Sequence, residues 1–131
     1  MAYTRFLLLV LLHQTGGVLE VNVPSSHQAR MGSETLIPCM FTVDKPRVNP
    51  KFLVVSWYFQ KKQILKLEDE VTLSDGRFYI NTSRAINGDV SLYISIVTIF
   101  DIGAYTCSVL YSPDMMEKQV RLVVHGNISI I

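Results

Sequence analysis

Cysteine occurs only twice in the 131-residue chain, at Cys39 and Cys107. Both positions follow an N-terminal segment typical of a secretory signal peptide, in which Arg5 precedes the apolar run from Phe6 to Leu12 and small or polar residues come next. Because the secretory pathway is oxidising, two cysteines there can pair. We therefore predict one disulfide within the domain, which closes a long loop and stabilises the fold by on the order of 4 kcal/mol.

The apolar run at the N-terminus is much shorter than the roughly 20 residues of a membrane-spanning helix. We expect cleavage near Gly17, which gives a signal peptide at 1–17, a mature domain at 18–125 and a C-terminal stub at 126–131. The sequence leaves two forms open: a secreted domain, or a domain held at the extracellular face of the plasma membrane by an anchor outside this sequence.

The charges of the mature part balance. The whole chain has 12 basic and 11 acidic side chains, and removal of Arg5 with the signal peptide leaves 11 of each. A balanced chain lacks the basic surface that nucleic acids need in a partner. The only histidines beyond residue 17 are His27 and His125, and no metal-binding or phosphate-binding motif appears. We expect no enzymatic activity, no metal, no cofactor and no small-molecule substrate.

Short β-branched or alternating runs separated by turn-forming residues predict an all-β chain. Ser74-Asp75-Gly76, Asn87-Gly88-Asp89 and Ser112-Pro113-Asp114 are typical turn sequences. Nine short strands favour a two-sheet sandwich. The predicted strands are Glu20–Val23, Thr35–Phe41, Val54–Gln60, Gln63–Leu67, Val71–Leu73, Phe78–Ile80, Ser91–Ile96, Ala104–Leu110 and Gln119–Val124.

Alternation along these strands also predicts the core, because successive side chains of a strand point to opposite faces of its sheet. Twelve side chains are expected to point inward. They are Val55, Trp57, Phe59, Leu92, Ile94, Ile96, Tyr105, Cys107, Val109, Val120, Leu122 and Val124.

Cys39, Trp57 and the run Leu92-x-Ile94-x-x-Val97-x-x-x-Asp101-x-Gly103-x-Tyr105-x-Cys107 resemble the immunoglobulin V-set. The resemblance covers most of the mature chain and implies a V-type Greek-key sandwich. It also implies that Cys39 and Cys107 join the two sheets, that Trp57 packs against the bridge and that the Tyr105 hydroxyl ties down a corner. Gly76-Arg77-Phe78 resembles the family's fourth-strand entry, which implies an ion pair between Arg77 and Asp101.

Two departures from the family pattern narrow the resemblance. The long separation between Cys39 and Trp57 implies an extended loop, and Met116-Glu117-Lys118-Gln119 stands where antigen receptors have a Phe-Gly-x-Gly turn. The chain therefore resembles non-rearranging V-set proteins such as natural cytotoxicity receptors, signal-regulatory proteins and butyrophilins.

The sequence contains two N-glycosylation sequons, at Asn81 and Asn127. The predicted secretory route makes both of them usable. Asn81 is the stronger candidate because the sequence ends shortly after Asn127.

The resemblance implies a non-enzymatic recognition domain that binds another cell-surface protein through the outer face of the tryptophan-strand sheet and the adjoining loops. A homophilic adhesion module that forms a homodimer, or a secreted soluble binding protein, is the alternative. The candidate partner-binding residues are Tyr58, Gln60, Ser108, Leu110, Tyr111, Met115 and Met116.

Overall fold

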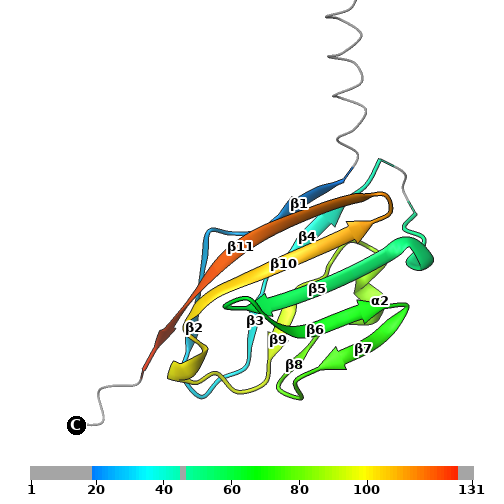
Figure 1. Cartoon of the computed structure of the whole chain (residues 1–131). Coiled ribbons are helices and arrows are strands. Elements are labelled where there is room, and N and C mark those ends of the chain that lie inside the picture. The colour runs from blue at the N-terminus through cyan, green and yellow to red at the C-terminus, as the bar shows by residue number, and fades with distance from the viewer. Residues whose placement is uncertain (1–18, 45–46, 127–131) are drawn as a thin grey trace, which may run out of the picture.

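The computed structural model describes residues 19–44 and 47–126, which form an all-β sandwich of two layers (Figure 1). The predicted signal peptide lies outside these residues. One layer is a six-stranded sheet in the order β2-β11-β10-β5-β6-β7. Its strands are β2 (Ser26–Arg30), β5 (Leu53–Phe59), β6 (Lys62–Glu68), β7 (Glu70–Ser74), β10 (Gly103–Tyr111) and β11 (Asp114–His125).

The other layer consists of two smaller sheets. Strands β3 (Thr35–Ile37), β9 (Leu92–Ile94) and β8 (Phe78–Tyr79) form one, and β1 (Glu20–Asn22) and β4 (Met40–Thr42) form the other. Three short helical segments connect strands: η1 (Pro50–Phe52), α2 (Thr82–Ala85) and η2 (Ile99–Asp101). Among the described residues, no helix is long and apolar enough to cross a membrane.

The predicted fold class is confirmed, and each of the nine predicted strands overlaps an observed one. The predicted strand Thr35–Phe41 is divided into β3 and β4 at Pro38, which has no N–H to donate to a neighbouring strand. Strand β2 was not predicted, because its side chains are mostly polar; it pairs in parallel with β11.

Nine of the twelve predicted core residues are buried, and three are not. Ile96 is 58% exposed because β9 ends at Ile94, so the alternation of the strand does not reach it. Phe59, the last residue of β5, is partly buried and stacks on Tyr105 with 4.7 Å between ring centroids. Val124 is partly buried near the end of β11, where the strand pairs with the edge strand β2.

The disulfide between Cys39 and Cys107 joins the two layers at the centre of the core. Its Cα atoms are 6.7 Å apart, and both cysteines are completely buried. Trp57 lies beside Cys107 in the register of β5 and β10, and its indole Nε1–H donates to the Val90 carbonyl at 2.9 Å. One covalent bond and one buried hydrogen bond therefore link the six-stranded sheet to the opposite layer within the packed core.

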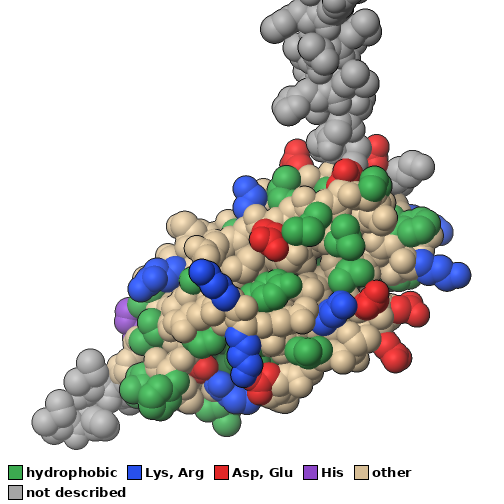
Figure 2. Space-filling model, viewed as in Figure 1, with side chains coloured by type: hydrophobic (Ala, Val, Ile, Leu, Met, Phe, Trp, Pro, Cys, Tyr) green, Lys and Arg blue, Asp and Glu red, His purple; other side chains and the backbone are tan. Residues whose placement is uncertain are grey.

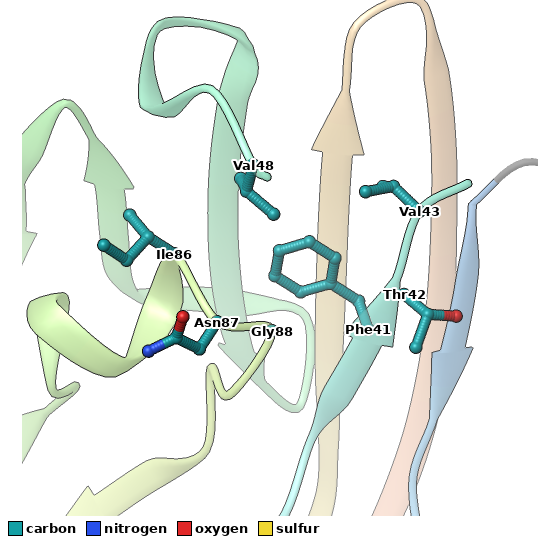
Figure 3. A pocket seen from close by; sticks show the side chains of 7 residues that line it. All are labelled: Phe41, Thr42, Val43, Val48, Ile86, Asn87 and Gly88. Atoms are coloured by element: carbon teal, nitrogen blue, oxygen red, sulfur yellow. The ribbon is translucent and has the colours of Figure 1, made fainter. Parts of the chain in front are cut away.

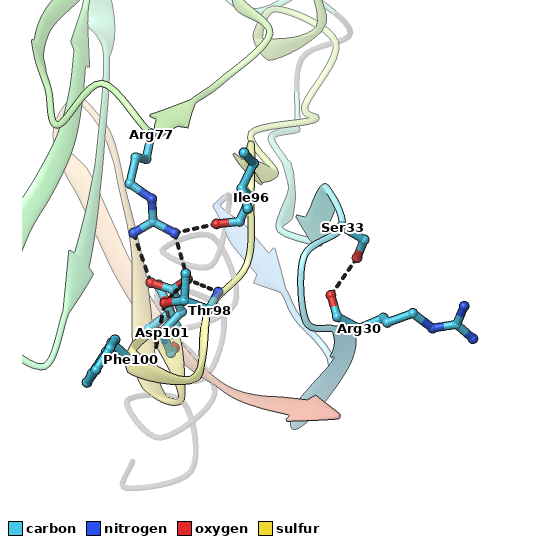
Figure 4. A network of polar contacts seen from close by, with 8 residues as sticks. Arg30, Ser33, Arg77, Ile96, Thr98, Phe100 and Asp101 are labelled. Carbon is cyan, nitrogen blue, oxygen red and sulfur yellow. Dashed lines mark hydrogen bonds and ion pairs between the residues drawn. The ribbon is translucent and has the colours of Figure 1, made fainter. Parts of the chain in front are cut away.

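Apolar side chains are exposed at the end of the sandwich where β11 ends. In and beside η2, Phe100 is 83% exposed and Ile99 is 55% exposed. Figure 4 shows Phe100 directed away from the polar residues behind it. These side chains contribute little to the core of the described domain.

Removal of the disulfide should destabilise the domain severely. The bridge closes a 68-residue separation, so the Cys39→Ala/Cys107→Ala variant should lose about 4 kcal/mol of unfolding free energy in the chain-entropy model. Urea unfolding of the secreted variant and wild type measures the difference, and a loss below about 1 kcal/mol would contradict the central position of the bridge.

Phe100→Ser should leave stability unchanged. The aromatic ring is already in solvent, so the unfolding free energy should change by less than about 0.5 kcal/mol. Phe41→Ser is the matched control, because the Phe41 ring is buried and its loss should cost about 3 kcal/mol or more. Equal effects of the two substitutions would show that Phe100 packs against the domain.

Candidate binding face

The side of the six-stranded sheet that points away from the core is called the outer face here. The register of the strands places side chains of β5, β6, β10 and β11 on this face. Its central residues are Val54, Ser56 and Tyr58 of β5, Thr106, Ser108 and Leu110 of β10, Met115, Glu117 and Gln119 of β11, and Gln63, Lys66 and Glu68 of β6. Figure 2 shows this face, on which hydrophobic side chains are interspersed with uncharged polar and charged ones.

Three candidate partner-binding residues lie on the outer face and remain accessible. Tyr58 and Leu110 are half-buried, and Met115 is 59% exposed. Leu110 and Met115 are direct neighbours across β10 and β11. Ser108 also lies on this face but is only 8% exposed, because larger neighbours surround its short side chain.

Gln60 lies outside β5, in the turn that leads to β6. Its backbone has a φ of 48°, and its N–H donates to the Ala104 carbonyl at 3.0 Å. The prediction that Gln60 belongs to the strand was therefore wrong, because the turn begins one residue earlier. Its exposed side chain lies over Gly103 beside the Phe59 ring, so it is not part of the outer face.

Met116 and Tyr111 belong to the opposite side of the sheet from Leu110. Met116 pairs with Val109, whose side chain is in the core, and both Met116 and Tyr111 pack partly against that core. The prediction that Tyr111 and Met116 lie in a loop after Leu110 was wrong, because β10 continues to Tyr111 and β11 begins at Asp114, so only Ser112 and Pro113 form the turn. The β10–β11 hairpin extends the sheet to residues that sequence reasoning left in a loop.

Tyr111 instead fixes the extended loop between β4 and β5. Its hydroxyl accepts a hydrogen bond from the Asn49 N–H at 2.9 Å, and its ring contacts Phe52 edge-on at a centroid distance of 6.5 Å. The Ser112 N–H donates to the Phe52 carbonyl at 3.0 Å. A groove of about 450 Å³ lies between this loop and the β10–β11 hairpin.

A second hollow, of about 200 Å³, lies on the other side of the same loop. Figure 3 shows the side chains of Phe41, Val48 and Ile86 turned toward it. Gly88 closes its edge with a φ of +93°, and its carbonyl accepts from the Phe41 N–H at 2.8 Å. Any side chain at Gly88 would collide with the Phe41 carbonyl, so only glycine fits here.

Arg77 and Asp101 form a two-pronged ion pair at the end of the sandwich near η2 (Figure 4). Arg77 Nη1 donates to Asp101 Oδ1 at 3.0 Å, and Nη2 donates to Oδ2 at 2.6 Å. Nη2 also donates to the Ile96 carbonyl at 2.6 Å. The Thr98 N–H donates to Asp101 Oδ2 at 2.7 Å, which completes a capping box at the start of η2.

Tyr105 ties the same corner to the core. Its buried hydroxyl donates to the Asp101 carbonyl at 2.8 Å. Burial acts to raise the pKa of Asp101, but the Arg77 and Thr98 hydrogen bonds outweigh it, so the pKa lies below its usual value. The hydrogen bond to Asp101 raises the pKa of Arg77. This cluster has a structural role, since each member is engaged by another.

Asn81 caps the N-terminus of α2. Its side-chain Oδ1 accepts from the N–H groups of Ser83 and Arg84 at 3.1 and 3.2 Å. The residue is exposed, and its Nδ2, the atom that a glycan modifies, is not used in the cap. Glycosylation of Asn81 stays a prediction, and Asn127 lies outside the described residues.

No cluster of three or more metal-ligating side chains occurs within residues 19–44 and 47–126. The two histidines of this part are separately engaged: His27 Nε2 lies 2.9 Å from the Thr35 hydroxyl, and His125 Nε2 lies 2.7 Å from Gln28 Oε1. Burial lowers the pKa of His27. These contacts bring no nucleophile, base or metal set together.

Comparison with known proteins gives a consistent family. The model of the immunoglobulin V-set domain matches residues 22–125. A rat protein, the hepatitis A virus cellular receptor 2 homolog, is 26% identical over 109 residues. That alignment includes 77% of this chain but only 38% of the rat protein, so the chain spans well under half the length of this relative.

Solved structures of V-type domains have the same fold. The human B7-H4 IgV-like domain matches with a TM-score of 0.73 at 18% identity, over 84% of this chain and 99% of that one. Bovine butyrophilin matches with a TM-score of 0.68 at 23% identity, over 82% of this chain and 55% of that one. Murine CRIg matches with a TM-score of 0.67 at 21% identity, over 83% and 99%.

Asp101→Asn should destabilise the domain by about 2 kcal/mol at neutral pH, because it removes the charge that Arg77 pairs with. Since the folded pKa of Asp101 is depressed, its contribution is present above the unfolded value of about 4 and is lost as pH falls through the folded value. The difference in unfolding free energy between wild type and Asp101→Asn should therefore become smaller at acidic pH. Urea unfolding at several pH values measures this difference.

Glu68→Gln is the matched control. Glu68 pairs with Lys66 at 3.4 Å, but 56% of its side chain is exposed, so its removal should cost less than about 0.5 kcal/mol. If the loss of unfolding free energy in Asp101→Asn did not depend on pH, the ionic role of Asp101 would be contradicted.

Proposed function

Because the chain belongs to the immunoglobulin V-set family, we propose that it is the recognition domain of a cell-surface immune receptor or ligand that binds another protein through the outer face. V-set domains of this kind are receptors and ligands, and the chain is not an enzyme. We place the mature domain at residues 18–125 behind a cleavable signal peptide, at the extracellular face of the plasma membrane or in secreted form.

The observation that supports this face most is a row of apolar residues near the β10–β11 hairpin. Val54, Leu110 and Met115 are neighbours across β5, β10 and β11, and Tyr58 lies four residues further along β5 on the same side of the sheet. Aromatic and methionine side chains are enriched in protein interfaces, whose buried centres are depleted in charge. In Figure 1 no labelled element lies in front of these strands, so a partner can reach the row.

Pairing with a second copy of the chain is the alternative use of the same face. Sedimentation of the purified protein at tens of micromolar separates the two: a monomer favours a distinct partner, whereas a dimer abolished by Leu110→Lys favours the homophilic module.

Leu110→Lys should weaken partner binding at least about tenfold, because it places a charge in the centre of an interface that excludes water. Multimers of the wild type and variant are measured on cells that express a library of surface proteins. Any clone that binds the wild type is titrated with both proteins.

Ile99→Lys is the matched control, since it makes the same change at an aliphatic residue that is 55% exposed in η2, away from the outer face. It should retain binding within about twofold. Equal binding by wild type and a folded Leu110→Lys protein would reject the outer face, and a larger loss with Ile99→Lys would place the interface near η2.

A further inference from the structure

The outer face has a hollow beside its middle. Ser56 and Ser108 lie side by side on β5 and β10, and each is only 8% exposed because larger neighbours surround its short side chain. Next to them an open hollow of about 230 Å³ is lined by Tyr58, Lys61, Thr106 and Glu117. This geometry suits a single side chain that projects from a partner protein.

The hollow offers hydrogen-bond acceptors that the domain does not use. Within the described residues, the Ser56 hydroxyl accepts from Gln63 at 3.1 Å, whereas no hydrogen bond occupies the hydroxyl of Ser108 or Thr106. Thr106 is partly exposed and lines the hollow, so a donor from outside the domain can reach its hydroxyl.

Glu117 lines the hollow with a carboxylate that no ion pair of the described residues engages. It lies opposite Ser108 in the register of β10 and β11, on the same side of the sheet. The ion pairs of the described residues join Lys66 to Glu68, Arg77 to Asp101 and Arg84 to Asp89, and none includes Glu117. A cation brought by a partner would find this carboxylate free.

We propose that this hollow takes an arginine side chain of the partner protein, whose guanidinium pairs with Glu117 and stacks on the Tyr58 ring. The inference rests on the proposed function and names the chemistry of the partner's central contact. A guanidinium has five N–H donors in one plane, so it can bond to the Glu117 carboxylate and the Thr106 hydroxyl while its face contacts an aromatic ring. An ammonium is more strongly hydrated and has fewer donors.

Lys61 allows the charge of the occupant to be tested, because its charge is opposite to that of Glu117. It lines the same hollow from the β5–β6 turn and is exposed, so it repels a cation and attracts an anion. An arginine occupant therefore predicts opposite effects of neutralising Glu117 and Lys61. An aspartate or glutamate occupant predicts the reverse pair of effects.

The first experiment titrates isotope-labelled protein with N-acetyl-arginine methylamide and follows its amide NMR signals. We expect saturable shifts at Thr106, Ser108 and Glu117 with an affinity on the order of 10 mM, as a single charge-assisted contact gives. Glu117→Gln should weaken this binding at least about threefold, and Lys61→Gln should leave it unchanged or strengthen it. N-acetyl-glutamate methylamide is the control probe.

The second experiment measures both variants against the cell-surface partner found with the wild type. Glu117→Gln should reduce binding about fivefold or more, while Lys61→Gln retains it. Loss of binding only with Lys61→Gln, or absence of saturable shifts with the arginine probe, would overturn the arginine proposal. If Leu110→Lys still abolished binding in that case, the proposed function would stand without it.

Discussion

The covalent bond between Cys39 and Cys107 is the constraint on which the rest of the domain depends. It connects the two layers at a point where everything around it is buried, and Trp57 places its indole beside it while donating to Val90 on the far layer. Because the two layers are fixed at their centre, their ends can carry loops of unusual length, such as the one between β4 and β5. The outer face then needs no covering element of its own.

Much of this arrangement could be predicted from the sequence, and the reasons are physical. Period-two alternation located the inward residues of the long strands, and the spacing from Leu92 to Cys107 resembles a known family. The alternation failed at Ile96, because the end of a strand is set by hydrogen bonding and not by hydrophobicity. It failed for β2 as well, since an edge strand with polar side chains has no apolar pattern to detect.

The candidate binding face was harder to predict than the core. Tyr58 and Leu110 were assigned to it and do lie on it. Met115 was predicted in a loop but also lies on it, whereas Met116 and Tyr111 face the other way. The difference depends on where the β10–β11 hairpin turns, which a turn sequence such as Ser112-Pro113-Asp114 locates only to within a few residues. The hollow beside Glu117 could not be predicted from the sequence for a related reason. It depends on which side chains become neighbours across three strands.

The parallel pairing of β2 with β11 has a mechanical consequence. The register runs from Ser26 beside Arg121 to Arg30 beside His125, so the chain enters β2 at one end of the ladder and leaves β11 at the other. A force pulling those two points apart acts along the strands, in shear. All the hydrogen bonds between β2 and β11 then carry the load together instead of breaking one after another. A domain stretched between two attached surfaces would therefore be loaded in shear at this edge.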